Sequence, residues 1–185
     1  MNSSIYQTPA TELPKDYKRM WFLDVLGALD GTHVDVRVPL HKQGRYRNRK
    51  KAITTNVLGI CDRNMKFVFV LAGWEGSASD GRVLRDAMFR EDSFKVPNGK
   101  YYLVDAGYTN SPGFFAPFRN TRYQLKEWAA NGNNPETPQE LYNLWHAIAR
   151  NVVERIWALL KMRWVILKIR VINACCILHN FLADR

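Results

Sequence analysis

The apolar positions of the chain first mark out four short strands. Residues 33–38, within the apolar segment 21–38, alternate polar with apolar side chains, as does a strand buried on one face. Asp30 and Gly31 lie inside this segment, where we expect a bulge or a close backbone approach to interrupt the strand. Three further strands are expected at residues 54–60, 67–72 and 101–104. The first two of these form a hairpin, because Asp and Asn in residues 62–65 favour a turn.

Helical spacing accounts for the other regular elements. Residues 81–90 carry apolar side chains on one face, and either Ser79 or Asp80 can be the N-cap of this helix. For Asp80, we expect an N-cap role rather than that of a fourth acid near the metal ions. Thr137-Pro-Gln-Glu140 is a capping box with proline at the first helical position. A last helix is expected at residues 169–183, and a loop at residues 107–135. This order predicts an α/β domain with a mixed sheet.

The long helix that begins after Thr137 is expected to run to about residue 164. Its apolar stripe is predicted to face the core and consists of Leu141, Trp145, Ile148, Val152, Ile156 and Leu159. The opposite side carries Asn143, Arg150, Glu154 and Lys161. This side is either a solvated face, on which Arg150 and Glu154 pair four residues apart, or the floor of a nucleic-acid groove.

The composition fits one globular domain preceded by a flexible tail over residues 1–20. The chain has 185 residues, of which 46% are hydrophobic and 24% charged. Its 27 Lys and Arg against 17 Asp and Glu give a net charge of +10, which favours a polyanionic partner such as nucleic acid. Three cysteines without zinc-ligand spacing indicate a reducing interior. No apolar run approaches the ~18 residues of a membrane span, so no membrane partner is expected.

Three acidic residues occupy positions suited to a metal-dependent nuclease. Asp30 and Asp105 lie inside or at the end of apolar runs, where an unpaired charge is costly to bury, and Glu154 lies on the long helix. Such carboxylates can hold two Mg²⁺ or Mn²⁺ ions about 4 Å apart, which activate a nucleophile and stabilise charge on the attacking and leaving oxygens. Chemistry alone leaves a structural role open for each acid.

Basic side chains gather between His41 and Lys51, a run with six Lys or Arg and no acid. We expect an exposed loop or ribbon there, and its alternative explanations are a solvated face or a nucleic-acid contact. The side chains expected to contact nucleic acid are Arg45, Arg47, Arg49, Lys50 and Lys51 in this run and Arg150 and Lys161 on the long helix.

Several short motifs follow one another along the chain, each occurring once. They are Ala28-Leu-Asp-Gly-Thr-His33, Tyr46-Arg-Asn-Arg-Lys50, Leu71-Ala-Gly-Trp-Glu-Gly-Ser77, Asp80-Gly-Arg-Val83, Leu103-Val-Asp-Ala-Gly-Tyr108, Asn151-Val-Val-Glu-Arg155 and Ala174-Cys-Cys-Ile-Leu-His-Asn180. Together they resemble the PIF/Harbinger transposase family, especially its plant transposase-derived nuclease-like members. Family members carry a helical region ahead of the first motif. We therefore expect residues 21–185 to form a DDE nuclease domain that lacks this region.

The resemblance implies an RNase H-like fold, a mixed sheet flanked by helices, with DNA as the substrate. Carried over motif by motif, it makes Asp30, Asp105 and Glu154 the catalytic acids and the ligands of two Mg²⁺ or Mn²⁺ ions. It also implies a nuclear location and a Myb-like DNA-binding partner, and a homo-oligomer is a further expectation. We thus expect a DNA endonuclease or strand-transferase. The alternative is a domesticated, non-catalytic nuclear protein that binds DNA or chromatin.

Overall fold

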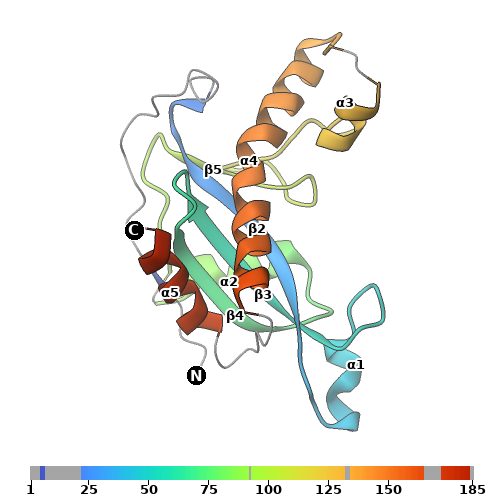
Figure 1. Ribbon diagram of the computed structural model, residues 1–185, viewed down its shortest axis with the longest axis vertical. Helices are drawn as coiled ribbons and strands as arrows, with labels where there is room; N and C mark the ends of the chain where they lie inside the picture. The colour runs from blue at the N-terminus through green and yellow to red at the C-terminus, as the bar shows by residue number, and fades with distance from the viewer. Residues whose placement is uncertain (1–4, 7–21, 92, 132–133, 165–171, 184–185) are drawn as a thin grey trace.

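The computed structural model describes residues 5–6, 22–91, 93–131, 134–164 and 172–183. Within them a six-stranded mixed sheet has helices on both faces (Figure 1), as an RNase H-like fold requires. The strands, in the spatial order β1-β4-β3-β2-β5-β6, are β1 (Ile5–Tyr6), β2 (Val25–Asp35), β3 (Thr54–Asp62), β4 (Phe67–Glu75), β5 (Tyr101–Leu103) and β6 (Phe114–Phe115). The helices are η2 (Leu40–Lys42), α1 (Gln43–Tyr46), α2 (Asp80–Phe89), α3 (Leu125–Asn131), α4 (Pro138–Arg163) and α5 (Ile172–Ala183). The predicted α/β class is confirmed.

The sheet changes from antiparallel to parallel pairing at β2. This strand pairs antiparallel with β3, which forms the expected hairpin with β4, and parallel with β5 on its other side. The hairpin turn is held by Asp62, whose Oδ1 accepts hydrogen bonds from the backbone N–H groups of Asn64 (2.8 Å) and Lys66 (3.0 Å). The expected interruption at Asp30 and Gly31 is wrong, because both residues keep their register opposite Gly59 and Leu58 of β3.

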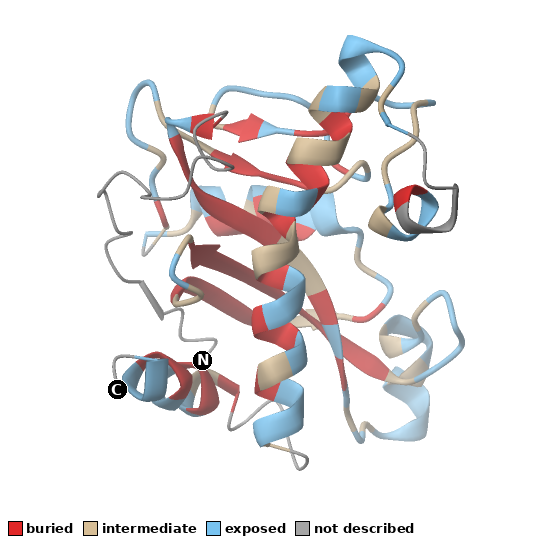
Figure 2. Cartoon of the chain, turned by 45° about the horizontal axis from the view of Figure 1, so that its top comes forward, coloured by how far each residue is buried: buried red, intermediate tan, exposed pale blue. Residues whose placement is uncertain are grey.

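Each face of the sheet has its own apolar core (Figure 2). On one face, α4 and α5 pack Val153, Trp157 and Ile172 against the strands. On the other, α2 contributes Val83, Leu84 and Ala87, as the spacing of its sequence predicts. A Cβ at Gly59 would lie only 2.3 Å from Cζ2 of Trp157, so glycine there lets the indole lie directly on β3.

Helix α4 starts as expected but buries a different face. Thr137 is its N-cap and accepts a hydrogen bond from the Glu140 N–H at 3.2 Å, with Pro138 in the first turn. The predicted apolar stripe is only partly right: Ile156 is buried and Trp145 and Val152 pack against the core, but Leu141 is 40% exposed and Ile148 41% exposed. The buried residues of the helix are Asn143, His146, Ala147, Arg150, Val153, Ile156, Trp157 and Leu160. Polar side chains can be buried on this face because they have hydrogen-bond and charge partners there. The spacing of hydrophobic residues in the sequence does not predict such burial.

Other expectations need smaller corrections. Residues 107–135 are not a loop throughout, because they contain β6 and α3. Ile5 and Tyr6 of the expected tail pair with Val70 and Phe69 of β4; the other residues of that tail lie outside the described residues. The last helix begins at Ile172, and residues 169–171 also lie outside. None of the described helices combines the length and apolar character needed to cross a membrane.

Candidate active site

Strand pairing brings Asp30 and Asp105 side by side. In the parallel pair of β2 and β5, Ala28 lies opposite Leu103, and each aspartate follows its paired residue by two positions. Asp30 is therefore inside β2, whereas Asp105 lies just beyond the end of β5. Neighbouring strands are about 4.8 Å apart, so the two carboxylates share one part of the sheet.

Glu154 on helix α4 is linked to the two aspartates by Arg150, which lies one turn before it on the same helix. Nη2 of Arg150 lies 3.3 Å from Oδ1 of Asp30 and 4.0 Å from Oδ2 of Asp105. Nη1 of the same guanidinium lies 2.6 Å from Oε1 of Glu154. Three acids from separate elements thus converge on one cation. The expected pair of Arg150 and Glu154 exists, but it is not a solvated face, because the Arg150 side chain is only 6% exposed.

The carboxyl of Asp30 has an unusual proton affinity. Burial raises its pKa from 3.8 to about 6, and the negative charges of Asp105, Glu154 and Asp80 add to this rise. The Arg150 guanidinium acts in the opposite direction and lowers the pKa. Because burial outweighs the single positive partner, the Asp30 carboxyl holds its proton more tightly than a free aspartate does.

Buried polar groups surround the three converging carboxylates, which together form the acid cluster. The hydroxyls of Tyr108 and Tyr123 are buried and have no hydrogen-bond partner among the described residues. Burial raises the pKa of both phenols, that of Tyr123 to about 12. The Nε2–H of His146 donates to the carbonyl oxygen of Phe115 at 3.0 Å, and burial lowers the pKa of this imidazole to about 4. His146 is therefore neutral near Arg150 at neutral pH.

A fourth acid, Asp80, lies beside Gly31, and its negative charge contributes to the raised pKa of the neighbouring Asp30. Of the two expected N-cap candidates, Ser79 holds that position, so the N-cap role preferred for Asp80 is wrong and Asp80 is the first residue of α2. Oδ1 of Asp80 accepts a hydrogen bond from Nδ2 of Asn56 at 3.0 Å and would lie 2.6 Å from a Cβ at Gly31. Because Gly31 has no side chain, the Asp80 carboxylate can lie close to the backbone of β2. A close approach was one of the two expectations for the Asp30-Gly31 pair.

The donor set suits a hard divalent cation. Mg²⁺ and Mn²⁺ prefer carboxylate oxygens, and Asp30, Asp105 and Glu154 supply oxygens that already face a positive charge. Within the described part of the chain, no three or more His, Cys, Asp or Glu side chains form a ready-made metal cluster. The cation among the three carboxylates is Arg150, a role that its sequence position did not reveal.

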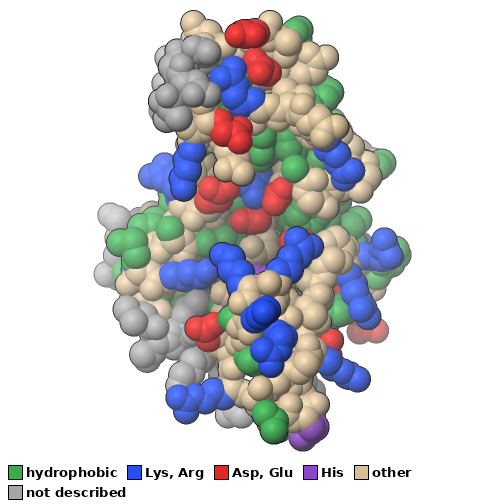
Figure 3. All heavy atoms as spheres, turned by 90° about the vertical axis from the view of Figure 1, so that its right-hand side faces the viewer, with side chains coloured by type: hydrophobic (Ala, Val, Ile, Leu, Met, Phe, Trp, Pro, Cys, Tyr) green, Lys and Arg blue, Asp and Glu red, His purple; other side chains and the backbone are tan. Residues whose placement is uncertain are grey.

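The basic run between β2 and β3 lies on an exposed arm that includes η2 and α1 (Figure 1). Arg45, Arg47, Arg49, Lys50 and Lys51 are all exposed. Arg45 pairs with Glu75 at 3.5 Å, and Nη1 of Arg47 donates to the carbonyl oxygen of Lys51. Figure 3 shows Lys and Arg side chains beside a hollow in which several Asp and Glu side chains lie.

Lys161 and Arg150 differ from the residues of the arm. Lys161 is exposed near one end of α4, where its Nζ donates to Oγ1 of Thr32 at 2.7 Å. This contact ties the end of the helix to β2. Arg150 is buried within the acid cluster, so it is not part of an exposed basic surface. Contact with nucleic acid stays a prediction for all seven basic residues.

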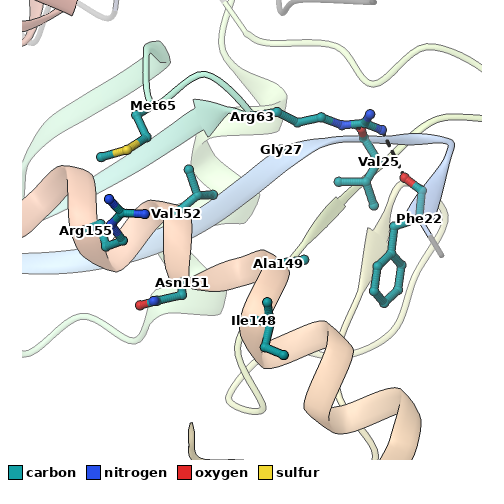
Figure 4. Close-up of a pocket in the computed structure, with 10 residues that line it drawn as sticks. All are labelled: Phe22, Val25, Gly27, Arg63, Met65, Ile148, Ala149, Asn151, Val152 and Arg155. Carbon is teal, nitrogen blue, oxygen red and sulfur yellow. Dashed lines mark hydrogen bonds between the residues drawn. The ribbon is translucent and has the colours of Figure 1, made fainter. Parts of the chain in front are cut away.

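A separate cavity of about 260 Å³ lies on another side of α4. Its walls come from β2, the β3–β4 turn and α4, including Val25, Arg63 and Val152 (Figure 4). Arg63 is held there by the backbone, since its Nε donates to the carbonyl oxygen of Val25 at 2.6 Å and its Nη2 to that of Phe22 at 3.0 Å. None of the three converging acids lines this cavity.

Comparisons with known proteins give one matching family and several relatives. Residues 29–180 match a family described as DDE superfamily endonuclease. The chain is 25% identical to "Protein ALP1-like" of Arabidopsis thaliana, over 85% of this chain and 43% of the relative. It is 28% identical to "Putative nuclease HARBI1" of Homo sapiens, over 84% of this chain and 45% of the relative. The chain thus spans about half the length of these curated relatives. No solved structure matches it significantly.

Proposed function

The chain belongs to the DDE superfamily of endonucleases, and on this premise we propose that it is a transposase-derived, divalent-metal-dependent nuclease that cuts DNA. The observation that carries the proposal is the convergence of Asp30, Asp105 and Glu154 on one positive charge. The three acids come from β2, the segment after β5 and α4, so only the folded chain assembles them. Strand transfer, in which a DNA 3′-hydroxyl replaces water as the nucleophile, uses the same site.

In this proposal the three carboxylates hold Mg²⁺ or Mn²⁺, with two ions bound when DNA is present. Bound ions activate the nucleophile and stabilise the charge on the attacking and leaving oxygens. Asp30 supplies the most enclosed carboxylate, since its side chain is 23% exposed, against 44% for Asp105 and 57% for Glu154. Asp105 and Glu154 therefore lie toward the side from which a phosphodiester can approach.

The exposed basic arm is the proposed phosphate-binding surface. Arg45, Arg47, Arg49, Lys50 and Lys51 extend from the sheet without burying their charges, as contacts to a polyanion require. Such contacts position DNA without reading its bases. A Myb-like partner that supplies sequence recognition, assembly into a homo-oligomer, and a nuclear location complete the proposal, and these three rest on the resemblance to Harbinger-type transposases.

The proposal is tested by nicking of supercoiled plasmid DNA with Mg²⁺, with Mn²⁺ and with a chelator. We expect nicking with either ion and none with the chelator. Asp30→Asn should reduce nicking by at least a hundredfold. Asp35→Asn should not, because it removes an equal charge from an exposed position on the same strand that contacts none of the three acids.

Two results would count against a nuclease. Equal nicking by wild type and Asp30→Asn would show that the activity comes from a contaminant. Metal-independent DNA binding without nicking under any condition would instead support the alternative, a non-catalytic nuclear protein that binds DNA or chromatin.

A further inference from the structure

The guanidinium of Arg150 is committed almost entirely to the acid cluster. Its hydrogen bonds and ion pairs go to Asp30, Asp105 and Glu154, with separations of 3.3, 4.0 and 2.6 Å. Its Nε is buried and has no hydrogen-bond partner among the described residues. The charge is therefore held in place by the same three carboxylates that would bind a divalent ion.

Arg150 and the three carboxylates depend on each other for charge compensation. Three carboxylates gathered in a partly buried site repel one another unless a cation lies between them. A buried arginine in turn requires anionic partners to offset its desolvation. Because Asp30, Asp105 and Glu154 come from different elements, the guanidinium also links β2 and the segment after β5 to α4.

The shape of the guanidinium allows this linkage. Nη1 faces Glu154 on its own helix, whereas Nη2 faces the two strand-borne aspartates. A planar group with several fixed donors can reach both sides at once, which a lysine ammonium cannot do with comparable geometry.

We propose that Arg150 is a positioning residue of the site, a resident counter-cation that assembles Asp30, Asp105 and Glu154 before a divalent ion arrives and that the ion must displace from these carboxylates. The inference rests on the proposed function. Arg150 and the divalent ion then compete for the same oxygens, so the arginine preserves the site at the cost of weaker metal binding. Removing it makes the empty site less stable and more attractive to a cation.

The direct test measures Mn²⁺ affinity by calorimetry and thermal unfolding with and without Mn²⁺, using the full chain. Arg150→Met, which keeps the length of the side chain but removes the charge, should unfold at a lower temperature without metal. It should bind Mn²⁺ at least about tenfold more tightly than wild type, equivalent to about 1.4 kcal/mol. The rise in unfolding temperature on adding Mn²⁺ should also be larger than in wild type.

Arg155→Met is the matched control. It removes the same charge from the same helix at an exposed position, and Arg155 lines the separate cavity rather than the acid cluster. Its Mn²⁺ affinity should change by less than about twofold, since exposed charges are screened. Unchanged or weaker Mn²⁺ binding by Arg150→Met would overturn the inference, because an arginine with a purely structural role does not compete with the ion.

A measurement on the wild type covers the case in which Arg150→Met does not fold. With ¹⁵N-labelled arginine, the Nη signals of Arg150 should show hindered rotation without metal and lose it at saturating Mg²⁺. Signals that stay hindered at saturating Mg²⁺ would mean that the guanidinium is not displaced, and the inference would be wrong. If the wild type bound neither ion, the proposed nuclease function would fail as well; if it bound and nicked without these changes, only this inference would fail.

Discussion

The two halves of α4 contact the rest of the protein in opposite ways. Its C-terminal half buries Val153, Trp157 and Leu160 against the sheet, with relative exposures of 4% or less. Its N-terminal half buries Asn143, His146 and Arg150, each of which has a hydrogen-bond or charge partner. One continuous helix thus provides an apolar anchor at one end and a polar framework for the candidate site at the other.

The difference shows how the helix can both stabilise the fold and hold charged groups. Apolar burial is non-directional and supplies most of the stability, whereas buried polar groups are stable only with matched partners. The anchor therefore fixes where α4 lies, and the polar half uses this placement to hold Arg150 among the acids. Substitutions in the two halves should separate these roles.

The largest effect on stability is expected in the apolar half. Trp157→Ala should lower the free energy of unfolding by about 3 to 5 kcal/mol, because it leaves a cavity over Gly59 and removes the ring contact with Phe67, whose centroid is 4.9 Å away. Denaturant unfolding measures the change. Ile148→Ala, at a 41% exposed position of the same helix, is the control and should cost less than about 1 kcal/mol. Equal losses would show that α4 packs through its other face.

A smaller effect is expected from the polar half. Asn143 accepts a hydrogen bond from the N–H of Phe118 at 2.8 Å and donates to its carbonyl oxygen at 3.0 Å. Asn143→Ala should cost about 2 kcal/mol, because it leaves these backbone groups without partners. Hydrogen exchange should show faster exchange at Phe118, while Asn151→Ala should leave it unchanged. Protection retained at Phe118 would contradict this role for Asn143.

The pKa of Asp30 predicts a pH-dependent effect. The metal-free folded chain holds the Asp30 proton more tightly than the unfolded chain, since the pKa is raised from 3.8 to about 6. This stabilising contribution is present below pH 4 and is lost as the pH rises through 6. The stability of Asp30→Asn relative to wild type should therefore increase by about 1 to 2 kcal/mol between pH 4 and pH 7.5.

Chemical unfolding without metal at both pH values measures this difference. Asp35→Asn, at the exposed end of the same strand, is the control and should show no such trend. A constant difference between Asp30→Asn and wild type would mean that burial does not dominate the ionisation of Asp30.

The smallest effect on stability is expected in the basic arm. Replacing Arg47, Arg49 and Lys50 with alanine should change the free energy of unfolding by less than about 0.5 kcal/mol, since these side chains are exposed. If they contact phosphates, the slope of log affinity for duplex DNA against log salt should flatten by up to about three, similarly for all sequences. An unchanged slope would support the solvated face as the explanation of this run.

Selection of binding sites from random duplexes would test whether the chain reads bases. We expect little enrichment, because phosphate contacts carry no sequence information. Strong enrichment of one motif at physiological salt would contradict the need for a separate recognition partner.

Much of the fold could be predicted because its signals are local. The alternation of residues 33–38, the hairpin turn at Asp62 and the capping box at Thr137 each concern a few neighbouring residues. The turn and the capping box match elements of the structure, whereas the alternation matches β2 only as far as Asp35, where the strand ends. The motifs also singled out the three acids as candidates, and their role stays a prediction. By contrast, the predicted core-facing side of α4 was right only in part, because hydrophobic periodicity does not recognise buried polar side chains that have partners elsewhere in the chain.

The sequence by itself determined the α/β class, the family and the identity of Asp30, Asp105 and Glu154 as candidate acids. Only the tertiary structure decided that these acids converge on Arg150, and that Asp80 lies against Gly31, the neighbour of Asp30. The physical reason is that both arrangements depend on contacts between residues as many as 120 positions apart, such as Arg150 with Asp30. Burial, pairing and pKa arise only when the sheet and α4 bring such residues together.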